Sequence, residues 1–236
     1  MNPVPTLSPP AARLRHDLAV AAIGLVLLLA WDFSGLDPQS MHVFGDAHGF
    51  AWREHWVART LLHDGGRWLG FVVLAALVVN VWRPLWAGPT RGERARWLIV
   101  TLSCLLAVPA LKQLSATSCP WDLAEYGGVA HYVSHWSFGA RDGGPGHCFP
   151  SGHATAAFAF IGGWFALRDH QPHVARRWMV AVIGFGLVFG LAQMARGAHY
   201  PSHTLWSAWL CWVISMVGAW RLEMRGLLAL RSAIAR

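Results

Sequence analysis

Lysine and charge are both scarce in this chain. Lys112 is the only lysine among 19 basic residues, and only 13% of the 236 residues are charged, whereas 55% are hydrophobic. This composition, with a mean hydropathy of +0.36, excludes an ordinary water-soluble domain. The net charge of +7 does not indicate a nucleic-acid partner, because the arginines separate apolar runs and do not form one basic face. The sequence therefore predicts an integral membrane protein.

The chain also lacks an internal repeat and any hydrophilic linker long enough to separate two domains. Six apolar stretches approach the ~20 residues that a helix needs to cross a bilayer. They cover residues 18–36, 69–86, 98–114, 153–167, 178–195 and 204–222. The predicted fold is all-α, a six-helix membrane bundle over residues 17–224. We expect a disordered cytoplasmic tail before it, residues 1–16, and a basic cytoplasmic tail after it, residues 225–236.

Arginine accumulates in alternate loops, and cytoplasmic loops are the ones that carry this excess. The arginine-rich loops and tails contain Arg13, Arg15, Arg83, Arg91, Arg94, Arg96, Arg168, Arg176, Arg177, Arg221, Arg225, Arg231 and Arg236. We expect this side to be cytoplasmic, with both termini, in the inner membrane of a bacterium. The first apolar run has no signal-peptide cleavage pattern, so an uncleaved first helix is expected. Residues 50–62 place apolar side chains against charged ones, which favours a helix lying in the outer interface over a plain outer loop.

Three short motifs fall on the opposite, periplasmic side. The first begins at Lys112, near the end of an apolar stretch, and ends at Cys119 and Pro120. An ammonium at that depth is functional by default, although a lysine that extends to the interface is the alternative. The second is Pro-Ser-Gly-His at 150–153, a helix start at which exposed backbone N–H groups can bind an anion. An ordinary helix cap with a solvated histidine is the simpler explanation of that string.

The third motif contains His199, followed by Tyr-Pro-Ser and then His203, and it is preceded by Arg196. Together the motifs resemble those of the type 2 phosphatidic acid phosphatase (PAP2) superfamily, which read Lys-x6-Arg-Pro, Pro-Ser-Gly-His and Ser-Arg-x5-His-x3-Asp. The resemblance is strongest from Lys112 to His203. It implies that His199 attacks phosphorus to give a phosphohistidine, that His153 protonates the leaving group, and that no metal or other cofactor is required. Lys112, Ser151, Gly152 and Arg196 are then the expected phosphate-binding residues.

Two motifs depart from the family pattern. Cys119 stands where the first motif has arginine, and Arg141 is the candidate replacement. Gln193 stands where the third has arginine, but Arg196 lies one helical turn further along the same face. His203 replaces the aspartate that orients the nucleophile; it can accept a hydrogen bond but supplies no negative charge. The sequence therefore predicts slower chemistry, an inactive site, or help from another acid, for which the candidates are Asp142, Asp122 and Glu125.

The four cysteines divide into two pairs. Cys104 and Cys211 fall within predicted spans and are expected to be buried thiols. Cys119 and Cys148 lie in the outer loops that carry the first two motifs, where an oxidising compartment would join them. We predict a disulfide that ties these loops together and replaces the contacts of the missing arginine.

The expected activity is release of phosphate from a membrane lipid phosphate or diphosphate: a polyprenyl, glycerolipid or lipid A phosphate. A lipid phosphotransferase of the same family, and a silent lipid-phosphate binder or transporter, are the alternatives. Thirteen histidines also raise the possibility of a metal or haem protein. Pro201 between His199 and His203 argues against helical zinc ligands there, and no histidine pair lies at matched depth in neighbouring spans to hold a haem.

Overall fold

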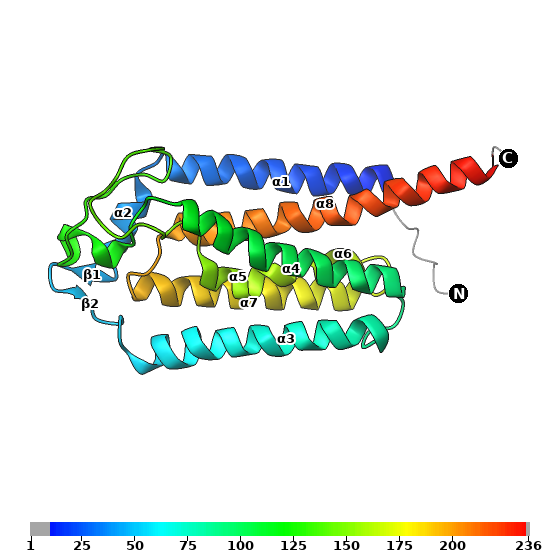
Figure 1. Ribbon diagram of the computed structural model, residues 1–236, viewed down its shortest axis with the longest axis horizontal. Helices are drawn as coiled ribbons and strands as arrows, with labels where there is room; N and C mark the ends of the chain where they lie inside the picture. The colour runs from blue at the N-terminus through cyan, green and yellow to red at the C-terminus, as the bar shows by residue number, and fades with distance from the viewer. Residues whose placement is uncertain (1–9, 235–236) are drawn as a thin grey trace.

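The computed structural model describes residues 10–234, and the side chains within that range up to residue 220. Long helices run side by side along the molecule, with shorter helices in the middle and small elements gathered at one end (Figure 1). The long helices are α1 (Pro10–Asp32), α3 (Gly65–Trp82), α4 (Arg91–Leu114), α7 (Pro172–Ala195) and α8 (Pro201–Ile234). The short helices α5 (Gly152–Phe158) and α6 (Gly162–Leu167) lie among them.

One end of the bundle carries α2 (Leu36–Met41) and the two-stranded hairpin of β1 (Gly45–Asp46) and β2 (Gly49–Phe50), and we call it the hairpin end. Helix α1 begins and α8 ends at the other end, the terminal end (Figure 1). The beginning of the first helix and the end of the last therefore lie on the same side of the bundle.

The prediction of an all-α membrane bundle is confirmed. In the described part of the chain, four helices are long and apolar enough to cross a membrane: Ala11–Asp32, Val57–Trp82, Arg91–Leu114 and Pro172–Ala195. The count of six is not met by this measure. The predicted span 153–167 consists of α5 and α6 joined by a 3-10 turn, and the predicted span 204–222 lies within the longer α8.

Tight packing explains the break between α5 and α6. A side chain at Gly163 would overlap Trp178 and Trp97, and one at Gly162 would overlap Val100. The indole of Trp178 donates a hydrogen bond of 2.8 Å to the Phe160 carbonyl, one of the groups that leave the regular α-helical pattern at the turn. Small residues let the short helices approach the tryptophans closely, so the break is stabilised by its surroundings.

Two boundary predictions differ from the structure. Residues 1–9 of the predicted tail lie outside the described residues, but α1 begins at Pro10, so residues 10–16 are helical. Proline fits the first turn of a helix, where its missing N–H has no partner to lose. The helix expected to lie in the interface at residues 50–62 is instead a π-helix, Val57–Asp64, that continues into α3 as one 26-residue helix.

Candidate active site

The three motifs converge at the hairpin end. The second motif opens α5, and the backbone N–H of Ser151 donates a 3.1 Å hydrogen bond to the carbonyl of His203 in the first turn of α8. The Ser207 hydroxyl donates to the Ser151 carbonyl from the same helix. The rings of His153 and His199 have centroids 6.5 Å apart. The charge of Lys112, in the last turn of α4, acts on both of these imidazoles.

His199 lies in the turn between α7 and α8 and is only 1% exposed. Its Nδ1 is 3.3 Å from Nδ1 of His203, so one of these nitrogens donates a hydrogen bond to the other. Burial lowers the pKa of His199 well below its ordinary value, and the nearby Lys112 lowers it further, while a hydrogen bond with the Cys148 backbone acts in the opposite direction. His199 is therefore a neutral imidazole whose Nε2 is not used in the His203 contact.

His203 takes the position at which the family has its orienting aspartate, and its Nδ1 meets the nitrogen that such an aspartate would orient. The three acids considered as helpers are engaged elsewhere. Asp142 accepts hydrogen bonds from Ser118 and Gly144. Asp122 accepts hydrogen bonds from Cys119 and Trp121. Glu125 lies 3.2 Å from His42. These carboxylates organise the loops of the hairpin end.

The carboxylate that stands behind His203 is Asp32, at the end of α1, which the motifs did not indicate. It accepts hydrogen bonds of 2.9 Å from the indoles of Trp136 and Trp206 and lies 3.3 Å from Nε2 of His135. The His135 ring meets His203 edge to face, with centroids 6.0 Å apart. The negative charge of Asp32 is thus separated from His199 by two rings, those of His203 and His135.

His153 is positioned by the start of α5, where the Ser151 hydroxyl accepts a hydrogen bond from the Ala154 N–H. Its ring lies against that of His63, with centroids 3.9 Å apart and the ring planes tilted by 33°. His63 belongs to the π-helix, and short stretches of π-helix are frequent at functional sites. Sequence reasoning missed His63, because that helix was expected to lie flat in the interface.

Gly152 faces open space, since a side chain there would meet no atom within 4 Å. A cavity of about 130 Å³ reaches this glycine between α3, α4 and α5, and its walls are mostly apolar, with Arg67 and Thr155 as the polar side chains. It is lined further by Gly70, Phe71, Leu74, Leu105, Pro109, Ala156 and Phe160. The N-terminus of α5 therefore adjoins a mostly apolar crevice.

Arg196 is 7% exposed and lies against Gln193, the residue at the family's arginine position. Its guanidinium donates to the Gln193 side chain at 3.4 Å and to the Arg53 carbonyl at 3.0 Å. Burial lowers the pKa of Arg196. Arg53 also lies over the Trp121 ring, 4.7 Å from its centroid. Arg141, the candidate replacement from the first motif, is exposed on its loop.

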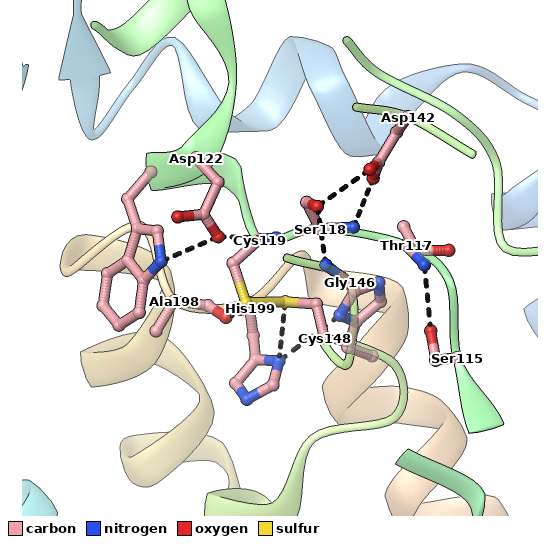
Figure 2. The surroundings of a disulfide bond; sticks show 12 residues. Ser115, Thr117, Ser118, Cys119, Asp122, Asp142, Gly146, Cys148, Ala198 and His199 are labelled. Atoms are coloured by element: carbon pink, nitrogen blue, oxygen red, sulfur yellow. Dashed lines mark hydrogen bonds between the residues drawn. A yellow bond between two sulfur atoms is a disulfide. The ribbon is translucent and has the colours of Figure 1, made fainter. Parts of the chain in front are cut away.

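A disulfide joins Cys119 to Cys148, with their Cα atoms 5.1 Å apart. It connects the loop after α4 to the loop before α5, and the His199 ring lies directly beside it (Figure 2). Cys148 Sγ is 3.7 Å from His199 Nδ1. Cys104 and Cys211 are free, buried thiols. The covalent link therefore ties the first two motifs together next to the third.

Residues 95–226 match the family model of the PAP2 superfamily. Because the match spans more than half of the chain and contains all three motifs, from Lys112 to His203, the chain belongs to the PAP2 superfamily. It is a multi-pass membrane protein with the fold of the family's phosphatases.

A solved structure supports the fold. The chain is similar to the first transmembrane PAP2-type phosphatidylglycerolphosphate phosphatase from Bacillus subtilis, with a TM-score of 0.53 and 16% sequence identity. The likeness covers 88% of this chain and 96% of the other. At this identity it concerns the fold alone. None of the curated proteins compared with the sequence matches it.

Proposed function

We propose that the protein is a phosphatase that removes phosphate from a membrane lipid phosphate or diphosphate through a phosphohistidine, without a metal or cofactor. The observation that carries the proposal is the arrangement of His199. It is buried and neutral, its Nδ1 contacts His203, and His153 stands beside it at the N-terminus of α5. A nucleophilic imidazole needs one free nitrogen and an orienting partner on the other.

The proposed reaction uses these groups in two steps. Nε2 of His199 attacks phosphorus, the P–O bond to the lipid breaks, and His153 gives a proton to the leaving oxygen. Water then attacks the phosphohistidine, with His153 accepting its proton, and the P–N bond breaks. Lys112, Arg196, the Ser151 hydroxyl and the backbone N–H of Gly152 stabilise the negative charge of the transferring phosphoryl group.

The crevice beside Gly152 supports a lipid as the substrate. Its walls are apolar except for Arg67 and Thr155, and two of the helices around it, α3 and α4, are long and apolar enough to cross a membrane. A substrate with a long hydrocarbon chain would place that chain in the crevice while its phosphate sits at the α5 N-terminus. The arginine distribution of the loops supports a periplasmic site in a bacterial inner membrane.

The test is phosphate release from polyprenyl, glycerolipid and lipid A phosphates by the purified protein. His199→Ala removes the nucleophile and is expected to lower kcat on the order of 10⁴-fold or more. His153→Ala removes the general acid and is expected to cost about 10²–10⁴-fold. His48→Ala changes an exposed histidine at the same end and serves as the control, with unchanged activity.

A rapid-quench experiment with lipid carrying labelled phosphate tests the intermediate. Wild type should form an acid-labile, base-stable phosphoprotein that His199→Ala does not form. Absence of phosphate release over the whole lipid panel would overturn the proposal and identify a lipid-phosphate binder. Transfer of label to a second lipid in place of water would identify a phosphotransferase.

A further inference from the structure

Three buried groups at the active site have the arrangement of metal ligands. Cys148 Sγ and nitrogen atoms of His199 and His203 all lie within 4.8 Å of one another, and all three residues are at most 1% exposed. In the structure Cys148 is bonded to Cys119, so its sulfur carries no charge and is not a strong ligand. Breaking that bond changes the chemistry of the cluster.

We propose that reduction of the Cys119–Cys148 disulfide converts this cluster into a zinc site formed by the Cys148 thiolate and the Nδ1 atoms of His199 and His203. The disulfide takes two electrons and two protons from a dithiol, which becomes a disulfide itself, and two cysteine thiols result. The Cys148 thiol then loses its proton to solvent as its sulfur donates an electron pair to the metal.

Two of the three ligand–ligand distances match those of a tetrahedral zinc site, and all three are within 4.8 Å. Tetrahedral zinc with Zn–N bonds of about 2.0–2.1 Å and Zn–S bonds of about 2.3 Å places two nitrogens about 3.3 Å apart and nitrogen and sulfur about 3.6 Å apart. The two Nδ1 atoms are 3.3 Å apart, and Cys148 Sγ is 3.7 Å from His199 Nδ1. Three protein ligands leave a fourth coordination position, as in other open zinc sites.

Charge makes the site dependent on the redox state. The ammonium of Lys112 acts on His199 and His203, and it repels a second cation as long as the cluster offers only two neutral imidazoles. A thiolate at Cys148 adds the negative charge that offsets this repulsion. Pro201, which argues against a helical zinc site in the sequence, is no obstacle, because His199 lies before α8 begins and the two Nδ1 atoms still meet.

Zinc at this site would stop the proposed reaction. The metal occupies His199 Nδ1, removes the hydrogen bond with His203 and withdraws electron density from the ring, so Nε2 becomes a weaker nucleophile. The metal site itself does not depend on phosphatase activity, because its ligands are defined by geometry alone.

Two cysteine variants form a matched pair that tests the site without any reductant. Cys119→Ser leaves a free thiol at Cys148, whereas Cys148→Ser leaves one at Cys119; both lack the disulfide. After incubation with zinc and desalting, Cys119→Ser should retain about one zinc per chain, as expected for one site of this kind. Cys148→Ser, oxidised wild type and the double variant Cys119→Ser/His203→Ala should retain only background zinc.

Cobalt gives an independent readout. Co²⁺ bound by Cys119→Ser should show a thiolate-to-cobalt charge-transfer band in the near ultraviolet, and Cys148→Ser should not. Zinc retention by Cys119→Ser no greater than by Cys148→Ser, or unchanged retention after His203→Ala, would overturn the proposal.

If the cysteine variants do not remain monodisperse in detergent, wild type and His203→Ala can be compared after treatment with a phosphine, which reduces the disulfide and takes up oxygen from water. Reduced wild type should bind zinc and reduced His203→Ala should not; equal binding would overturn the proposal. In reduced wild type, phosphate release should fall with zinc and recover with a chelator. A protein that binds zinc in this way but never releases phosphate would refute the phosphatase and leave the metal site standing.

Discussion

Charged side chains are paired differently at the two ends of the bundle. At the terminal end, Arg168 binds both oxygens of buried Asp17 at 2.8 Å, Arg13 pairs with Asp169, and Glu93 lies 3.2 Å from His170. At the hairpin end, no carboxylate forms an ion pair with Lys112 or Arg196 among the residues whose side chains the structure describes. Removing one partner of a buried ion pair destabilises a fold, whereas partly buried or buried cations without a carboxylate partner are available to an anion from outside. The proposed phosphate site at the hairpin end requires this difference.

Replacing one cation at each end with methionine tests this difference and is expected to give the largest effects. Lys112→Met should lower kcat about 10²–10³-fold, because a donor to the phosphoryl oxygens is lost, and should leave thermal stability nearly unchanged. Arg168→Met leaves Asp17 buried without its partner and should cost roughly 3–5 kcal/mol of stability. Phosphate release and thermal unfolding are measured on both variants. Equal loss of stability in the two would contradict the contrast.

The substitution His203→Asp tests whether the absence of a carboxylate beside His199 slows the proposed reaction at the hairpin end. It places a negative charge directly on His199 Nδ1 and stabilises the imidazolium-like ring that forms during attack. A gain of ~1 kcal/mol in the transition state corresponds to about a fivefold rise in rate. His203→Asn, which has the shape without the charge, is the control and should not exceed wild type. Loss of activity in His203→Asp alone would show that the imidazole has a function of its own.

The pH dependence is the smallest expected effect. Because the pKa of His199 is lowered in the folded protein, the acid limb of the kcat/KM profile should lie below the ordinary histidine pKa of about 6.5. The unfolded chain binds a proton near that pH and the folded chain does not, so stability should decrease as pH falls below about 6.5. His199→Gln removes this group and should make the stability curve flatter between neutral and mildly acidic pH.

The sequence predicts the candidate site best where its residues lie in short motifs. Lys112, His153 and His199 occupy the three motifs, and the structure brings their segments together. It was less informative where a partner is distant in the chain. Asp32 lies next to His135, which is 103 residues later in the chain. The His63 ring contacts that of His153 from a π-helix, a type of helix that apolar periodicity does not distinguish. Such contacts depend on tertiary packing, which local patterns do not contain.

Apolar patterns in the sequence also do not locate the ends of helices accurately. The second span was placed at 69–86, but α3 ends at Trp82 and Arg83 is extended, with φ −118° and ψ 107°. Pro84 disfavours the helical conformation of the residue before it, a local rule that outweighs the apolar character of the residues beyond. The sequence also predicts a single helix over 153–167, because hydropathy does not reveal the tryptophan packing that stabilises the break between α5 and α6.

The N-terminus of α8 is held by a carboxylate from near the start of the chain. Asp37 in α2 accepts hydrogen bonds from the backbone N–H and the hydroxyl of Ser202, 165 residues later, and from the indole of Trp31. The segment between His199 and His203 is therefore fixed only when the earliest and latest parts of the polypeptide have met. A nascent chain that has not yet inserted α8 holds the first two motifs but lacks His203 and the contacts of Ser202 with Asp37, so under the proposed function it should be inactive until α8 is in place.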